Sequence, residues 1–308
     1  MITAFLTTVF FSISAISATR LAHLLGGVAA NFWRILLATI FLAVLTMSVG
    51  SGFGGTPLLT FFWSGLVGFG IGDLALYQAL PRLGSRLSVL LVHCLAAPFG
   101  ALIEWVWLGT VLDALQLLFG ATTLIGVALA LAQPNRSVPI GGEWWTGLCC
   151  GILAGLGQGG GAVLSRKAYV LARDSQMDVS GFTAAFERIL GGLIIAGAAY
   201  FFWRWKVANT IREQGIAGSP KECRIIATWL VLNSISGPVL GVACYQHALR
   251  YVPTGVVLPI VALTPLVILP FSMHIEGERP TLRSILGGVI AVGGVIGLLW
   301  ARSRHFTG

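Results

Sequence analysis

Five ionisable residues lie inside apolar stretches of this sequence, where charged groups are rare: Arg34, Asp73, Glu104, Glu187 and Arg188. Placing such a group in hydrocarbon costs at least about 2.5–3.5 kcal/mol, so each one needs a physical explanation. They can form ion pairs that hold helices together, or they can bind a polar or charged solute. The residue types alone leave both explanations open.

The spacing predicts one ion pair. Arg34 lies about six residues into the second apolar stretch and Asp73 about seven residues from the end of the third, which places both roughly 10 Å deep on the same side at 1.5 Å per residue. Arg188 occupies the place of Arg34 in the second half, but Gly241 stands where the acid would be. Arg188 therefore pairs with Glu104, snorkels to the interface, or is free to hold an anionic group of a substrate.

Uncharged polar residues also lie in apolar stretches, namely Tyr77, Gln78, Tyr245 and Gln246. Their phenol and amide groups can hydrogen-bond a polar solute in a central cavity, or they can hydrogen-bond neighbouring helices. Gln158 lies beside a run of glycines and is a further candidate. Both explanations, a site and helix packing, remain open for these residues.

Several chemistries are excluded by the motifs that are missing. The histidines His93, His247 and His274 are not at metal-ligand spacing, and the five cysteines form no CxxC pair. The sequence has no P-loop, no GxSxG and no DDxxD-like cluster. We therefore expect no metal, no cofactor and no ATP-driven pump.

The composition identifies the elements that must position these residues. Of the 308 residues, 56% are hydrophobic and only 10% are charged, whereas a soluble domain has roughly 25% charged residues. The mean hydropathy is +0.88. These values exclude a cytoplasmic enzyme, a disordered chain and a secreted disulfide scaffold. They predict an all-α membrane protein that crosses the cell membrane several times.

The apolar runs, cut at charges and turn residues, predict ten transmembrane helices. A single span needs about 20 apolar residues. The expected spans are residues 2–19, 28–49, 58–80, 87–108, 114–132, 146–165, 181–203, 226–249, 255–275 and 283–301. The polar stretch 206–224 is expected to be the one sizeable loop.

Glycines indicate where helices pack closely. Gly147, Gly151, Gly155 and Gly159 recur at every fourth position of the sixth span and predict a smooth stripe. Gly120 and Gly126 in the fifth span are mirrored by Gly287 and Gly293 in the tenth. Small residues let helix backbones approach each other in lipid, so we expect packing seams at these positions.

The net charge of +8 comes mostly from Lys and Arg between the apolar stretches, which is typical of loops at a membrane surface and does not indicate nucleic-acid binding. More of them follow the odd-numbered spans than the even-numbered ones. The positive-inside rule would then place the connections after odd-numbered spans in the cytoplasm and both termini outside.

The two halves of the chain repeat several motifs in the same order. The matched segments are Phe32–Leu36 with Phe186–Leu190, Tyr77-Gln78 with Tyr245-Gln246, Arg82 with Arg250, and Pro98 with Pro265. Each half, residues 1–133 and 134–308, holds five spans. An odd number of spans makes the second half enter the membrane from the opposite side, so the repeat is inverted. Inverted repeats place a binding site at their interface and let it open to either side alternately.

These motifs resemble the drug/metabolite transporter superfamily, specifically its ten-helix EamA-type branch. The resemblance rests on FxR in the second and seventh spans, on Gly72-Asp73 and Leu83–Arg86 around the third, on the repeated prolines, and on the Gly-Glu at Gly277-Glu278. One departure is Gly109-Thr110, where the family usually has Gly-Glu. The resemblance implies secondary transport, often export, of small metabolites, with both termini in the cytoplasm, against the charge rule.

We therefore predict a secondary transporter, and more specifically an exporter, that moves a small polar metabolite or drug by alternating access. The driving force is a proton gradient or simple facilitated diffusion. The candidate substrate-binding residues are Tyr77, Gln78, Glu104, Gln158, Arg188, Tyr245 and Gln246. Two alternatives from other classes are an intramembrane enzyme acting on a lipid or prenyl substrate and a non-transporting membrane scaffold.

Overall fold

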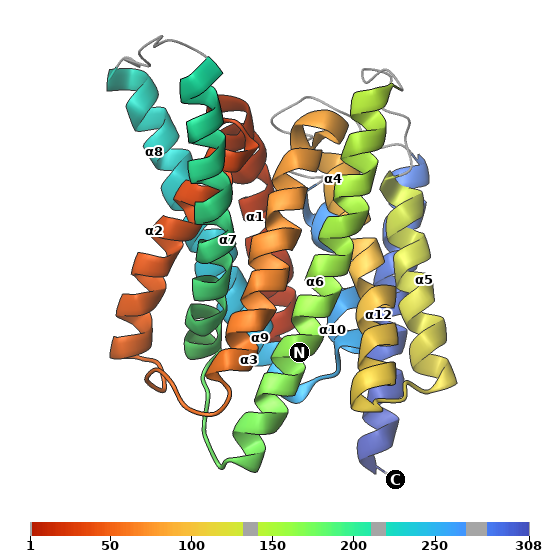
Figure 1. Cartoon of the computed structure of the whole chain (residues 1–308). Coiled ribbons are helices and arrows are strands. Elements are labelled where there is room, and N and C mark those ends of the chain that lie inside the picture. Colours follow the sequence, from red (N-terminus) through yellow and green to blue (C-terminus); the bar gives the residue numbers. More distant parts are fainter. Residues whose placement is uncertain (1, 132–140, 211–219, 269–281, 308) are drawn as a thin grey trace.

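The apolar stretches form helices in the computed structural model of the chain, and most of these helices run along one common direction (Figure 1). The structure describes residues 2–131, 141–210, 220–268 and 282–307. Every regular element in these ranges is a helix. A helix satisfies its backbone hydrogen bonds internally, which is required of a segment that crosses a bilayer.

Two of the described elements, η1 and η2, are π-helical, and the others are α-helices. In chain order the elements are α1 (Ile2–Leu25), α2 (Gly27–Ser48), α3 (Leu58–Gly65), η1 (Leu66–Gly72), α4 (Asp73–Leu108), α5 (Ala114–Leu131), α6 (Gly142–Asp174), α7 (Gly181–Thr210), α8 (Pro220–Ser234), η2 (Ile235–Gly241), α9 (Val242–Tyr251), α10 (Thr254–Val261) and α12 (Leu282–Thr307).

Each of the ten expected spans contains helix among the described residues, and the ninth is described only up to residue 268. Seven helical segments are long and apolar enough to cross a membrane, and three apolar helices are shorter. The third span consists of α3, η1 and the start of α4, and the eighth consists of α8, η2 and α9. Within α4, Gly84 has φ 79° and ψ 164°, a conformation that glycine adopts without strain. This residue separates the third span from the fourth.

The helices extend beyond the expected spans. The first helix continues to Leu25, and α6 covers Gly142–Asp174 instead of 146–165. The stretch 206–224, expected to be a loop, is helical up to Thr210 and again from Pro220. Charged residues therefore mark where a span leaves the apolar layer, but they do not interrupt the backbone hydrogen bonds of the helix.

The structure repeats features at corresponding places in the two halves. The π-helical segment η1 lies in the third span and η2 lies in the eighth. Arg82 donates to Glu143 at 2.7 Å, and its counterpart Arg250 forms an ion pair with Asp178. The division at residues 133 and 134 lies outside the described residues and stays a prediction. His274 and the Gly-Glu motif with Glu278 also lie outside them.

Glycines bring helix backbones into close contact. A Cβ atom at Gly159 would lie 2.7 Å from the carbonyl oxygen of Ala96, so the stripe on α6 packs against the fourth span. A Cβ atom at Gly126 in α5 would lie 2.4 Å from the backbone nitrogen of Ala291 in α12, and one at Gly287 would lie 2.3 Å from that of Ala130. The same test finds open space at Gly293, so only part of the mirrored glycine pattern is a seam.

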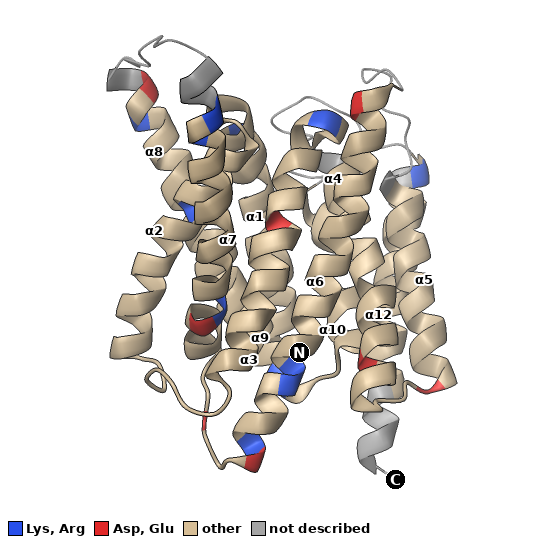
Figure 2. Ribbon diagram, in the orientation of Figure 1, with Lys and Arg blue, Asp and Glu red and all other residues tan. Residues whose placement is uncertain are grey.

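Among the residues that the structure describes, charged positions are found mostly toward the two ends of the bundle, and fewer lie along its length (Figure 2). Many large apolar side chains of the described helices are exposed, as expected for helices that face lipid. The few charges that remain within the bundle are therefore the residues whose contacts decide what the interior can bind.

The seam between α5 and α12 generates the first test. Replacing Gly126 or Gly287 by Leu should lower the yield of folded protein severalfold, because the new side chain meets backbone atoms of the facing helix that cannot move aside. Size-exclusion chromatography of the purified variants measures this loss.

The matched control is Gly288→Leu on the same helix, since a Cβ atom there meets nothing within 4 Å. This variant should behave as the wild type does. Equal yields from Gly287→Leu and Gly288→Leu would show that the close approach of the two backbones does not matter for folding.

Candidate functional site

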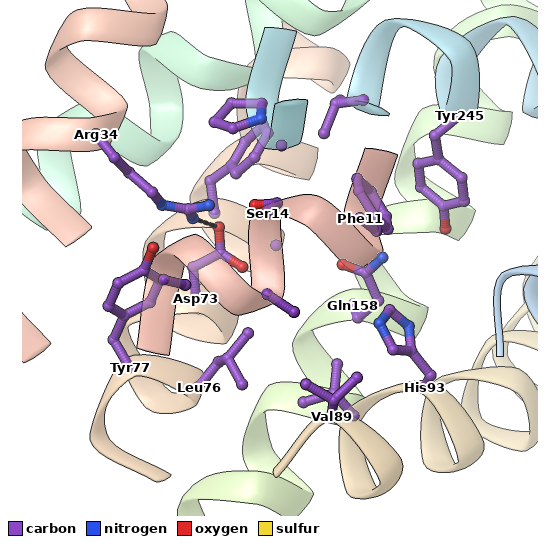
Figure 3. A pocket seen from close by; sticks show the side chains of 18 of the residues that line it. Phe11, Ser14, Arg34, Asp73, Leu76, Tyr77, Val89, His93, Gln158 and Tyr245 are labelled. Carbon is purple, nitrogen blue, oxygen red and sulfur yellow. Dashed lines mark hydrogen bonds and ion pairs between the residues drawn. The ribbon is translucent and has the colours of Figure 1, made fainter. Parts of the chain in front are cut away.

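A pocket lies in the interior where residues of both halves of the chain meet (Figure 3). Its cavity volume is about 90 Å³. Its walls come from α1, α2, η1 and α4 of the first half of the chain and from α6, α7, η2 and α9 of the second half. Four of the seven predicted binding residues line it: Tyr77, Gln158, Arg188 and Tyr245.

Arg34 and Asp73 form an ion pair in the wall of this pocket (Figure 3). The sequence predicts this pair from depth alone. The Arg34 side chain is 7% exposed and that of Asp73 is 18% exposed. Arg34 also donates from Nε and Nη2 to Asn31 Oδ1, both at 3.3 Å, and its guanidinium lies 4.9 Å from the centre of the Tyr77 ring. These contacts neutralise the guanidinium and leave Asp73 facing the pocket.

A hydrogen-bond chain links Tyr77 to the first and eighth spans. Asn233 donates from Nδ2 to the Tyr77 hydroxyl at 2.8 Å, and Ser14 donates to Asn233 Oδ1 at 2.9 Å. Ser234 donates to the carbonyl oxygen of Arg34 at 3.1 Å. Asn233 and Ser14 are not among the residues that the sequence predicts for the site. The one signal in the sequence is the amide of Asn233 within an apolar run. It does not identify the contacts, because the partners are more than 150 residues apart along the chain.

Arg188 has a different environment, although it matches Arg34 in the repeat. It is 3% exposed, and its Nε atom is buried without a hydrogen-bond partner. Its guanidinium lies 5.2 Å from the centre of the Phe69 ring. Within the described part of the chain it forms no ion pair. At the position of the missing acid, a Cβ atom on Gly241 would lie 2.7 Å from the Phe11 ring, so an acidic side chain would not fit there.

Glu104 interacts with residues outside the pocket. It accepts from the backbone nitrogen of Thr254 at 2.7 Å and from the Thr254 hydroxyl, at the first residue of α10, and from Arg166 Nε at 3.3 Å. It does not line the pocket, and the pairing with Arg188 considered above is not formed. A carboxylate at this place satisfies a free N–H group of the helix and favours its dipole. The geometry therefore favours a structural role for Glu104.

Gln78 and Gln246 also lie outside the lining of the pocket. The side-chain oxygen of Gln78 accepts from Arg82 Nη1 at 3.0 Å. Gln246 is fully buried, and neither its oxygen nor its nitrogen has a partner. On an α-helix, residues adjacent in sequence point about 100° apart, so Tyr77 and Tyr245 face the pocket while the glutamines that follow them do not.

Glu187 is adjacent to Arg188 and faces the connection between α2 and α3. It is fully buried, accepts from the backbone N–H of Gly54 at 3.1 Å through Oε1, and leaves Oε2 without a partner. The same connection is held by Thr183, which accepts from the Ser51 N–H at 3.0 Å and donates to the Gly52 carbonyl at 3.1 Å. The connection is thus fixed on the first turns of α7.

The model of the EamA-like transporter family matches the chain over residues 1–132 and 145–300. Twenty-eight chains of solved structures also match. One of them, described only as "Crystal structure of protein", aligns with a TM-score of 0.66 over 95% of this chain and 98% of its own, at 12% identity. That likeness concerns the fold alone. No protein of curated function matches the sequence.

The ion pair generates the second test. Arg34→Gln or Asp73→Asn should lower the melting temperature by about 5 °C or more, because each leaves one buried charge without its partner. Exchanging the two residues should restore part of the loss. The recovery stays incomplete, since Asn31 and the Tyr77 ring favour a cation at position 34. An exchange that is no more stable than either single variant would show that the pair contributes nothing.

Proposed function

This chain belongs to the EamA-like transporter family, and we propose that it is a secondary transporter that exports a small polar metabolite or drug across the cell membrane by alternating access. The observation that carries this proposal is the pocket: both halves of the chain contribute to its walls, and it contains charged and hydrogen-bonding side chains in an otherwise apolar bundle. A site between repeated halves can open to one side and then to the other as the halves rock.

The charges of the pocket favour a carrier over an enzyme or a scaffold. An intramembrane enzyme that acts on a lipid or prenyl substrate needs a cluster of acids or histidines near one interface. The described residues contain no group of three His, Cys, Asp or Glu side chains that could hold a metal ion. A scaffold has no use for a pocket with a buried arginine that lacks a counter-charge, because that arginine lowers the stability of the fold.

We propose further that protons drive the transport and that Glu187 is the residue that takes up and releases them. Among the acids buried in the described spans, Asp73 and Glu104 each have a cationic partner, whereas Glu187 has only the N–H of Gly54. Its charge can therefore change without breaking an ion pair. A change in the charge of Glu187 alters its hydrogen bond to Gly54 in the connection between α2 and α3. This connection packs on the first turns of α7, next to Arg188.

The third test uses the purified protein in liposomes loaded with a soluble metabolite extract of cells, with the outer medium analysed by mass spectrometry. Solute should leave liposomes with protein faster than empty ones, and an imposed pH gradient should raise the rate severalfold. Glu187→Gln should keep the basal rate but lose the acceleration, since glutamine still accepts from the Gly54 N–H but carries no proton.

The matched control is Asp174→Asn, which neutralises an exposed acid at the end of α6 and should leave both rates unchanged. Flux that never exceeds that of empty liposomes would contradict transport. If the pH gradient does not change the rate of the wild type, the result would contradict proton coupling but not transport. A new product inside the liposomes would instead favour the enzyme.

A further inference from the structure

The two repeated arginines differ in one respect that bears on the substrate. Arg34 has a carboxylate, an amide oxygen and an aromatic ring around it. Arg188 contacts the Phe69 ring, forms no ion pair among the described residues, and interacts with the Asp73 carboxylate only at longer range. We infer that Arg188 holds the anionic group of the substrate, and that the transported solute is an organic molecule with one negative charge, most simply a carboxylate. This inference rests on the proposed function, because it names the class of solute bound in the same pocket.

Arg188 carries a buried positive charge. An arginine side chain keeps its positive charge in proteins, and burying that charge without a partner is costly. Arg188 is 3% exposed and lines the pocket, so it does not reach the membrane surface. A bound anion supplies the missing negative charge, and Arg188 can offer it two parallel N–H donors.

The charged residues around the pocket do not neutralise one another completely. Its lining contains four residues that can be charged: Arg34, Asp73, His93 and Arg188. Arg34 and Asp73 neutralise each other, and His93 is neutral or positive. With a neutral imidazole at His93, which has no acidic partner among the described residues, the pocket has a surplus of one positive charge. This surplus repels cationic solutes and is matched by a solute with a single negative charge.

Other polar atoms of the pocket also lack hydrogen-bond partners. The Tyr245 hydroxyl and His93 Nδ1 line the pocket, are buried, and have no partner. Figure 3 shows Tyr245, Gln158 and His93 together on one side of the pocket, away from the pair of Arg34 and Asp73. A buried polar atom without a partner is costly, so these groups indicate the place where a ligand supplies acceptor and donor atoms.

The backbone leaves room for the guanidinium. A Cβ atom at Gly68 would lie 2.8 Å from Nη2 of Arg188, and one at Gly161 would lie 3.2 Å from it. Gly68 lies in the π-helical segment η1 and Gly161 in α6. These glycines let Arg188 extend between the two helices, and a larger residue at position 68 would displace its guanidinium.

The remaining wall is largely apolar and includes Phe11, Phe69, Leu76, Val89 and Val92. These side chains accommodate the uncharged part of a solute and gain from its burial. A small inorganic anion would leave this surface without a partner. The pocket therefore fits an anion with an apolar body, and neither an inorganic ion nor a cationic drug.

The test compares cells that express the wild type, Arg188→Gln, Arg188→Lys or no transporter, by the metabolites that accumulate in the medium. The metabolites that depend on the protein should be negatively charged at neutral pH. Their export should fall at least tenfold in Arg188→Gln and should remain partly active in Arg188→Lys. Lys167→Gln removes one positive charge from α6 outside the pocket lining and should export as the wild type does.

A second measurement uses the purified proteins and three probes of similar shape, namely benzoate, benzamide and benzylammonium. Benzoate should raise the melting temperature of the wild type, and the other two should not. The Arg188→Gln variant should fold normally and lose the benzoate effect, because Arg188 forms no ion pair among the described residues that the substitution would break.

The outcomes separate the inference from the proposed function. Export of neutral or cationic metabolites, or unchanged export by Arg188→Gln, would overturn the inference and leave transport intact. An absence of any exported metabolite would count against the proposed function, and the benzoate measurement then decides the inference. Stabilisation by benzamide equal to that by benzoate would overturn it.

Discussion

A guanidinium inside an apolar helix bundle needs a negative partner, because neither lipid nor packed side chains can replace the water that it loses. Arg34 has that partner in Asp73, which reaches it from the neighbouring span. Arg188, at the corresponding place in the second half, has none among the described residues. The interior therefore contains one ion pair and one arginine without an ion-pair partner. This difference between the two halves gives the pocket a net positive charge.

Close backbone packing makes this arrangement possible. Glycines on α6 let it approach the fourth span on one face and η1 on the other, where a Cβ atom at Gly157 would lie 2.7 Å from Cα of Gly72. Helices in lipid associate through such contacts, since burial of apolar surface contributes little there. The larger residues that remain at the centre, including Tyr77, Tyr245 and Phe11, then surround the pocket instead of filling it.

Depth along a helix was enough to predict that Arg34 and Asp73 pair, and apolar runs were enough to place the ten spans. The contacts of Glu104 were not predictable in this way, because its partners Arg166 and Thr254 come from distant segments whose packing fixes the contact. The π-helical turns of η1 and η2 leave no periodic signal in their short, glycine-containing sequences. The sequence also could not show which of two adjacent polar residues faces the pocket. Tyr245 lines it, and Gln246 does not.

The central claim is that one water-accessible pocket is lined by both halves of the chain, and the reactivity of single cysteines with a small hydrophilic thiol reagent tests it most directly. In a variant whose five native cysteines are replaced, single cysteines at Ser14 and Leu76 in the first half and at Gln158 and Val242 in the second should all react. Cysteines at Leu118 and Val289, which are exposed on the outer surface of α5 and α12, should not react from within lipid. Reaction in only one half, or in neither, would contradict the shared pocket.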